Sequence, residues 1–364
     1  MKKFLSHFVR IIVDILLFFK SPTDSSRQPK TLLIKDDAIG DFLVSTGALK
    51  TLTSFFSQKS EVYCLVDKKV AGLAEIFIDK EKLISVDKEK FENSVSYRFK
   101  FFKKLRCMNF QFLVASSTRS TYCDQTASRI SCEKKWALVG ETSRQKKRAS
   151  IYTDIIEVAE CPHVNLPVEA VQKEILLLEG VLGRLSNQKE YWPQIPTEKL
   201  LPISEKNYFV LLPDAGDKRR TWKKSELYIW ALEKAQEKGL KCFVLSAFRD
   251  ENPILLDPSF ENKTGKTNLL ESLSYIRSAQ FAVAHETGLG HATWMIGTPL
   301  LMIMGGGYFK EFTPNAPRLN IVAKEMPCFN CHWNCIYPTQ DRFPCVEQLK
   351  LEDLDKALRQ LITK

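Results

Sequence analysis

Glycine and proline are scarce in this chain, with 15 and 16 residues among 364. Their scarcity excludes collagen-like repeats and low-complexity segments, which depend on these residues. No uninterrupted apolar run reaches the roughly 20 residues that a membrane-spanning helix needs. The hydrophobic content of 44% is that of a packed globular protein and excludes wholesale disorder. At about 150 residues per domain, the length indicates two domains.

Negative charge is also in short supply. Lys and Arg number 53 against 43 Asp and Glu, which leaves a formal net charge of +10. This excess predicts anionic partners, such as phosphorylated small molecules, acidic lipid or nucleic acid. Because the sequence contains no recognisable nucleic-acid-binding module, we expect no nucleic-acid partner.

The N-terminal segment and one later segment are both basic and apolar. The stretch Phe8–Phe19 is interrupted by Arg10 and Asp14, and no clean signal-peptide cleavage site follows it. It is interpreted either as a basic amphipathic helix on the inner membrane surface or as a helix packed on the protein. Arg98–Arg106 contains five cations and three Phe, which favours contact with an anionic glycolipid or membrane over a solvated helix face.

Strand-like apolar runs alternate with helical patterns, which predicts parallel sheets covered by helices. A proline-bearing stretch, 191–206, interrupts this alternation and is typical of a linker. The predicted strands are Thr31–Lys35, Glu61–Val66, Phe110–Ala115, Trp136–Val139, Tyr208–Leu212, Cys242–Ser246, Phe281–Ala284 and Leu300–Met304. Predicted helices include Asp41–Phe56, Ser225–Lys238, Asn268–Ser278 and Gly288–Ile296.

The first motif with chemical potential is Lys35-Asp-Asp-Ala-Ile-Gly-Asp41, directly after the first strand. Asp41 would stand at the start of the next helix, where an Asp is ordinarily an N-cap. The functional alternative is a carboxylate that acts as a general base. Asp36 and Asp37 would then raise its pKa by like-charge repulsion and are the next candidates for the role.

The second motif, Pro213-Asp-Ala-Gly-Asp-Lys-Arg-Arg-Thr-Trp-Lys-Lys224, follows the first strand of the second half and is strongly basic. α/β folds bind ligands at the carboxyl ends of their strands, so we favour diphosphate binding over a merely solvated loop.

The third motif, Ala284-His-Glu-Thr-Gly-Leu-Gly-His291, lies between a strand and a helix. Thr287 is a suitable N-cap, and Gly288 and Gly290 would leave backbone N–H groups accessible to an anion. His291 would lie in the first helical turn. The motif lacks the Walker Lys-Ser/Thr and the full dinucleotide fingerprint, which argues against a P-loop ATPase and a nicotinamide enzyme.

Together the three motifs resemble glycosyltransferase family 9, the heptosyltransferases of lipopolysaccharide core synthesis. The resemblance rests on LLIKDDAIGDFLVSTGALKTL at 32–52, on LLPDAGDKRRTW and on AHETGLGHATWMIGTPLLMIMGG at 284–306. It implies a GT-B fold, with two Rossmann-like domains facing each other across a cleft. The expected regions are a basic amphipathic segment (1–30), an acceptor domain (31–190), a linker (191–206), a nucleotide-sugar donor domain (207–325), and a Cys-rich tail with a terminal helix (326–364).

The implied reaction is metal-independent, inverting transfer of a sugar from a nucleotide diphosphate, such as ADP-heptose, to a hydroxyl of a lipid-linked saccharide, with no cofactor. By resemblance Asp41 matches the catalytic base, and Arg220 or Lys218 matches the phosphate-binding cation. Thr287, Gly288 and His291 match the donor-binding turn, and Glu286 stands where the family usually has Asp. The scattered cysteines and the basic amphipathic N-terminal segment predict a cytoplasmic protein that is peripherally bound to the inner face of the membrane.

Two alternatives concern the whole chain and its tail. A non-catalytic sugar-nucleotide-binding or membrane-scaffold protein on the same fold remains the second hypothesis. In the tail, Cys328, Cys331, Cys335 and Cys345 approach the spacing of a structural zinc site, although packing by reduced thiols is favoured because the spacings are irregular. The other cysteines are scattered singly, which suits reduced thiols.

Overall fold

The computed structural model describes residues 28–116, 121–140, 149–158, 169–183, 191–313, 315–337 and 341–363. They divide into two compact units. The first holds the described residues up to 158 and residues 172–192, and the second holds 169–171 and 193–363. The amphipathic segment predicted over 1–30 lies outside the described residues except for its last three. Within the described ranges, no helix is both long and apolar enough to cross a membrane.

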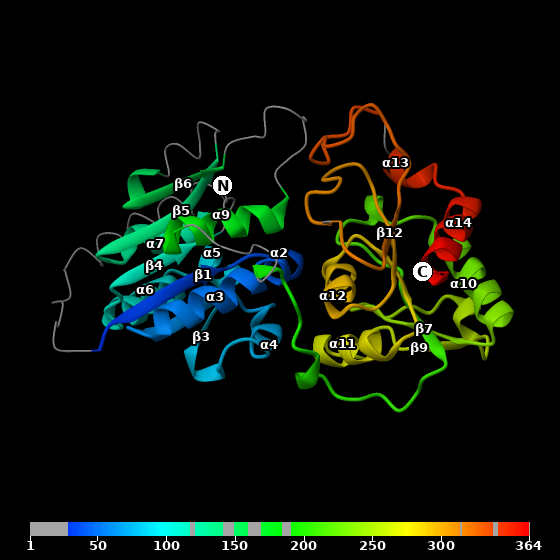
Figure 1. Cartoon of the computed structure of the whole chain (residues 1–364), viewed down its shortest axis with the longest axis horizontal. Helices are drawn as coiled ribbons and strands as arrows, with labels where there is room; N and C mark the ends of the chain where they lie inside the picture. The colour runs from blue at the N-terminus through cyan, green and yellow to red at the C-terminus, as the bar shows by residue number, and fades with distance from the viewer. Residues whose placement is uncertain are drawn as a thin grey trace. The chain divides into compact units, whose positions relative to one another are not determined.

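The first unit is built on a six-stranded parallel sheet with strand order β3-β2-β1-β4-β5-β6 (Figure 1). Its strands are β1 (Lys30–Lys35), β2 (Glu61–Asp67), β3 (Leu83–Val86), β4 (Phe112–Ala115), β5 (Lys134–Gly140) and β6 (Asp154–Val158). Its helices are α2 (Ile39–Val44), α3 (Thr46–Ser57), α4 (Ala71–Ala74), α5 (Lys88–Asn93), α6 (Val95–Cys107), α7 (Thr121–Arg129) and α9 (Ala170–Leu182).

The start of α3 illustrates why the sequence folds this way locally. The predicted single helix over Asp41–Phe56 is two helices that meet at Ser45. A Cβ added at Gly47 would lie 2.0 Å from the backbone oxygen of Tyr191, so only glycine allows this returning chain to pass so close. The start of α3 is thereby held against residues that follow α9.

The second unit repeats the topology, with strand order β12-β11-β10-β7-β8-β9 and every neighbouring pair parallel. Its strands are β7 (Tyr208–Leu212), β8 (Lys241–Val244), β9 (Phe260–Asn262), β10 (Ala282–His285), β11 (Leu300–Ile303) and β12 (Leu319–Val322). Its helices are α10 (Lys224–Lys238), α11 (Leu269–Ser278), α12 (Gly288–Ile296), α13 (Pro344–Glu347) and α14 (Leu351–Ile362). In both units the chain reverses direction across the sheet beside its first strand, as in doubly wound nucleotide-binding folds.

The C-terminal residues, predicted as a separate tail, contribute to the core of the second unit. Leu354, Leu358 and Leu361 of α14 pack with the side chains beneath α10. The two helices lie side by side in Figure 1, with α14 in red. Asp355 accepts a hydrogen bond from the Trp230 indole at 2.9 Å and lies 3.1 Å from the Lys234 ammonium, which ties α14 to α10.

Candidate active site

The second and third motifs leave neighbouring strands of the second sheet at the same edge. β7 pairs with β10 in parallel, with Leu212 opposite Ala284. The order of strands reverses between these two, and ligands bind at such a switch point in open α/β sheets. The backbone N–H of Trp222 donates to His285 Nε2 at 2.8 Å, so the basic loop is fastened directly to the end of β10.

Most cations of the basic loop are already paired with carboxylates. Arg219 forms a bidentate ion pair with Asp217, in which Nη2 donates to Oδ2 at 2.7 Å and Nε donates to Oδ1 at 3.2 Å. Hydrogen bonds from the Arg219 side chain and backbone lower the pKa of Asp217 to about 2. Lys223 lies 3.3 Å from Glu226. These pairs leave little positive charge on those residues for a ligand.

Lys224 is paired most completely. Its ammonium lies 2.7 Å from Asp214 and 2.6 Å from Asp250. Asp214 also accepts a hydrogen bond from Ser246, and Asp250 accepts one from the Tyr228 hydroxyl at 2.8 Å. This network ties the ends of β7 and β8 to the start of α10, so Lys224 is a structural cation.

Lys218 and Arg220, which the sequence predicts to bind phosphate, differ from the other cations of the loop in their lack of a carboxylate partner in the described residues. Lys218 is exposed and Arg220 is half-buried. Both belong to the short 3-10 turn Lys218–Arg220, which Asp217 caps by accepting from the Arg219 N–H at 2.9 Å. The loop therefore presents two cations whose charge a ligand can neutralise.

The turn after β10 supplies backbone donors beside this loop. Thr287 is the N-cap of α12, as predicted, and its hydroxyl accepts from the Gly290 N–H at 3.1 Å. Gly290 is therefore not one of the accessible amides, and a Cβ there would lie 2.7 Å from the His285 carbonyl oxygen. Gly288 and Leu289 keep first-turn N–H groups for which the described residues provide no acceptor. A helix N-terminus of this kind favours anions.

Two histidines flank this turn, and the structure gives them different places. His285 is buried and was missed as a functional candidate, although it ends a buried strand inside the motif. Burial lowers the pKa of His285 to about 4, and because its Nε2 accepts from Trp222, the neutral ring carries its proton on Nδ1. His291, predicted to bind donor, is only 5% exposed, and burial lowers its pKa to about 4 as well. It can offer a hydrogen bond but no charge at neutral pH.

Glu286 and Asp41 are the two candidate carboxylates. Glu286 is half-buried, and its backbone N–H donates to the Ile303 carbonyl at 3.2 Å. Asp41 is half-buried in α2 of the first unit. Its interpretation as an N-cap is wrong, because the N-cap is Ala38, whose extended backbone (φ −71°, ψ 168°) precedes the helix. Asp41 is the third residue of α2, where a carboxylate interacts favourably with the helix dipole.

The residues before Asp41 are held by the first unit itself. The Lys35 ammonium is buried and lies 2.6 Å from Glu174 of α9. Asp36 is only 1% exposed, and its carbonyl accepts a hydrogen bond from Lys88. Asp36 is therefore a poor substitute for Asp41 as a base, whereas the half-buried Asp37 is still accessible. Burial raises the pKa of Glu174, an effect that the Lys35 charge partly offsets.

Most of the aromatic part of Arg98–Arg106 is buried, and of its three Phe residues only Phe99 is half-buried. This segment belongs to α6, and Phe101, Phe102 and Leu105 are buried in the core of the first unit. Arg98 is buried too, and its guanidinium donates to the Phe91 carbonyl. The exposed residues are lysines: Lys100, Lys103 and Lys104. The helix thus presents mainly cations, with Phe99 as its only partly exposed Phe.

The cysteines of the described residues are all free thiols. Cys345 is buried, and its Sγ accepts from the Gly306 N–H at 3.4 Å. Burial, with a smaller contribution from the neighbouring thiols, raises the pKa of Cys328 and of Cys345. In the described part of the chain, no group of three or more His, Cys, Asp or Glu is arranged to hold a metal ion.

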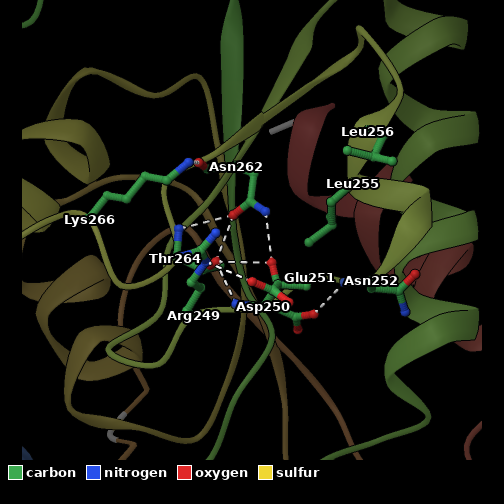
Figure 2. Close-up of a pocket in the computed structure, with 9 residues that line it drawn as sticks. All are labelled: Arg249, Asp250, Glu251, Asn252, Leu255, Leu256, Asn262, Thr264 and Lys266. Carbon is green, nitrogen blue, oxygen red and sulfur yellow. Dashed lines mark hydrogen bonds and ion pairs between the residues drawn. The ribbon is translucent and has the colours of Figure 1, made fainter.

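A separate pocket of about 310 Å³ lies beyond the ends of β8 and β9. Figure 2 shows Leu255 and Leu256 on one side of it and Arg249 and Lys266 on the other. Its polar groups are bonded to one another: the Asp250 N–H donates to Thr264, and the Asn262 amide donates to the Asp250 carbonyl. The pocket borders the Lys224 network but brings no candidate site residue into its lining.

Comparison with known proteins identifies the family to which this chain belongs. The model of glycosyltransferase family 9 (heptosyltransferase) matches residues 112–337, well over half of the chain. The chain belongs to this family and is a glycosyltransferase. No curated protein sequence is similar enough to count as a match.

Solved structures extend the likeness to both units. Escherichia coli ADP-heptose lipopolysaccharide heptosyltransferase II has a TM-score of 0.67 at 15% identity, covering 92% of this chain and 98% of that one. E. coli heptosyltransferase WaaC with ADP has a TM-score of 0.69 at 15% identity, covering 91% and 99%. The iron-containing dodecameric glycosyltransferase TibC from enterotoxigenic E. coli has a TM-score of 0.51 at 13% identity, covering 92% and 76%. The predicted GT-B-type α/β fold is confirmed.

Proposed function

We propose that the chain is an inverting glycosyltransferase that moves a sugar from a nucleotide diphosphate to a hydroxyl of a lipopolysaccharide core or related surface glycan. The observation that carries the proposal is the edge of the second sheet. There, Lys218 and Arg220 have no carboxylate partner in the described residues, and their loop is hydrogen-bonded to His285, shortly before the first-turn amides of α12. This combination matches a diphosphate, which takes charge-assisted hydrogen bonds from side chains and a helix N-terminus.

The proposed mechanism divides the work between the two units. Asp41 takes the proton from the acceptor hydroxyl as that oxygen attacks the anomeric carbon from the face opposite the leaving group. The bond from the anomeric carbon to the diphosphate oxygen breaks, and the electron pair leaves with the nucleoside diphosphate. Arg220 or Lys218, with the amides at Gly288 and Leu289, stabilises the negative charge as it develops. Glu286, Thr287 and His291 are proposed to contact the donor around this turn.

Heptose carried by ADP is the favoured donor, because the structural neighbours are named for ADP-heptose and for complexes with ADP. We propose that the transfer needs no metal, since Asp41 supplies the base and the basic loop supplies the charge. TibC is described as iron-containing, so metal dependence is measured directly on this chain.

Release of nucleoside diphosphate tests the proposal. The full chain is incubated with ADP-heptose and other nucleotide sugars, with and without lipopolysaccharide-core acceptor, in buffer with and without EDTA. We expect acceptor-dependent release with inversion at the anomeric carbon, unchanged by EDTA. Binding without turnover on any donor and acceptor would instead favour the non-catalytic nucleotide-sugar-binding or scaffold protein.

We further propose that the enzyme works at the cytoplasmic face of the membrane, where its lipid-linked acceptor is exposed. The support is the α6 face, on which Lys100, Lys103 and Lys104 are exposed at a spacing that places them together. No carboxylate of the described residues forms an ion pair with any of the three. Such a face is attracted to anionic lipid by about 1 kcal/mol per cation.

A further inference from the structure

The segment between β12 and α13 packs on the loop that follows β11. This loop is a run of three glycines, Gly305–Gly307, and aromatic rings lie directly against it. A Cβ added at Gly307 would lie 2.2 Å from the Trp333 indole, and one at Gly306 would lie 2.2 Å from the Phe329 ring. Only glycine allows the indole to come so close to this backbone.

Backbone hydrogen bonds hold the segment in this place. The Asn330 N–H donates to the Gly306 carbonyl at 2.6 Å, and the His332 N–H donates to the Gly307 carbonyl at 2.8 Å. Asn330, His332 and Trp333 all have positive φ, at 65°, 51° and 63°, a conformation that residues with a Cβ seldom adopt. A run of such residues persists where the surrounding structure enforces it, and it clusters at functional sites.

Two consecutive arginines of the basic loop stack on aromatic rings of this same segment. The Arg219 guanidinium lies 4.8 Å from the Phe343 ring centroid, and the Arg220 guanidinium lies 5.0 Å from the Trp333 centroid. The two rings are themselves packed together, with centroids 5.0 Å apart. The two arginines differ in their hydrogen-bonding partners. The N–H groups of Arg219 donate to the Asp217 carboxylate, whereas Arg220 has no carboxylate within ion-pair distance in the described residues.

A stacked guanidinium keeps its N–H donors available, because the ring occupies the flat face and the donors point out of the edge. Trp333 can therefore fix the plane of the Arg220 guanidinium and leave its positive charge available. A carboxylate partner would neutralise that charge. We propose that Trp333 is a positioning residue that holds Arg220 flat and oriented, so that its free edge meets two oxygens of the donor diphosphate. This inference rests on the proposed function, because it names what orients the phosphate-binding arginine.

The proposal predicts that the effect of Trp333 on nucleotide binding acts through Arg220. The Kd of ADP, or of the best-bound nucleoside diphosphate, is measured by calorimetry on full-length wild type, Trp333→Met, Arg220→Ala and the double variant. Met keeps an apolar side chain but removes the aromatic face. We expect Trp333→Met to weaken binding roughly 3- to 30-fold in the wild-type background, as loss of a cation–π contact does. In the Arg220→Ala background it should change Kd less than 2-fold.

Two further variants separate positioning from general damage to the fold. Trp333→Phe keeps a flat ring and should restore Kd to within about 3-fold of wild type. Ile336→Ala changes a 74% exposed side chain of the same segment and should leave Kd unchanged. Melting temperatures identify any variant that does not fold. If Trp333→Met does not fold, the cycle is run with Trp333→Phe against Trp333→His, of which Phe should bind nucleotide more tightly.

The possible results are distinguishable. An equal loss from Trp333→Met with and without Arg220 would overturn the positioning role and leave the proposed function intact. Trp333→Met binding as wild type does would overturn it as well. A wild-type chain that binds no nucleoside diphosphate and releases none from any nucleotide sugar would overturn the proposed function, and the inference with it.

Discussion

The two sheets share one strand order, but the charged residues around their candidate site residues are paired differently. At the first edge, the buried Lys35 ammonium pairs with half-buried Glu174, and Lys88 donates to the Asp36 backbone carbonyl. At the second edge, carboxylates pair with Arg219 and Lys224, while Lys218 and Arg220 have no carboxylate partner among the residues that the structure describes. Under the proposed function, the first edge supplies one chemical group, the Asp41 carboxylate, and the second edge binds an anion.

We expect the largest effect on sugar transfer from a change at Asp41, the proposed base of the first unit. Asp41→Asn removes the proton acceptor, so sugar transfer at saturating substrates should fall about 100- to 10,000-fold. Because Asp41 is not an N-cap, Asp41→Asn should cost about 0.3–1 kcal/mol of stability through the weakened interaction with the helix dipole. Nucleotide affinity should not change. Turnover like that of wild type would remove Asp41 from the mechanism and leave Asp37 as the accessible alternative.

The second edge is tested by Arg220→Ala, for which affinity and rate should fall together. The cation meets the diphosphate in the ground state and the more negative leaving group in the transition state. Its loss should cost on the order of 2–4 kcal/mol in kcat/KM. Lys223→Ala is the matched control, since Lys223 is paired with Glu226. If Arg220→Ala is silent while Lys218→Ala is severe, Lys218 is the phosphate ligand; if both are silent, the loop is a solvated surface.

The exposed lysines of the two units offer a third comparison, away from the edges. Changing Lys100, Lys103 and Lys104 to Gln should weaken binding to anionic vesicles by about 1 kcal/mol per residue. The control changes three exposed lysines of the second unit, Lys206, Lys238 and Lys324. Sedimentation with anionic and zwitterionic vesicles measures the difference. Equal effects of the two triple variants would show that net charge, not the α6 face, governs the attraction.

Acid should affect the second unit through its buried histidines. His285 and His291 have pKa values of about 4 in the folded protein, against about 6.5 when unfolded. The unfolded chain therefore binds protons first, and stability that is complete above pH 6.5 is lost as the pH falls towards 4. At pH 5 each histidine should cost about 2 kcal/mol. Urea unfolding at pH 7 and 5 should show a smaller loss for His291→Gln, and an unchanged loss would exclude His291 as a source.

The central strands of both sheets were predictable from the sequence, whereas the edge strands were not. The eight predicted strands correspond to β1, β2, β4, β5, β7, β8, β10 and β11, which lie inside the sheets. The four that were missed, β3, β6, β9 and β12, are the sheet edges. A central strand such as β7 is buried at every residue, but the edge strand β12 (Leu319–Val322) buries only Val322. Edge strands therefore lack the continuous apolar run by which buried parallel strands are recognised.

In the candidate site too, some features were predictable from the sequence and others were not. The local features followed from spacing: Thr287 caps α12, and Lys218 and Arg220 lie in one turn. The long-range partner did not follow, since nothing in the basic loop shows that Trp333, far along the chain, lies over the Arg220 guanidinium. The burial of His291 was also out of reach, because it depends on residues such as Phe312, whose ring lies 6.2 Å away.

A thermal-shift panel of nucleoside diphosphates and nucleotide sugars on the full chain tests the central claim most directly. A ligand that binds the folded state raises the melting temperature by mass action. The division of labour predicts that ADP or ADP-heptose raises it, equally in wild type and in Asp41→Asn, and much less in Arg220→Ala. No shift with any nucleotide, or a full shift in Arg220→Ala and Lys218→Ala alike, would contradict the assignment of donor binding to the edge of the second sheet.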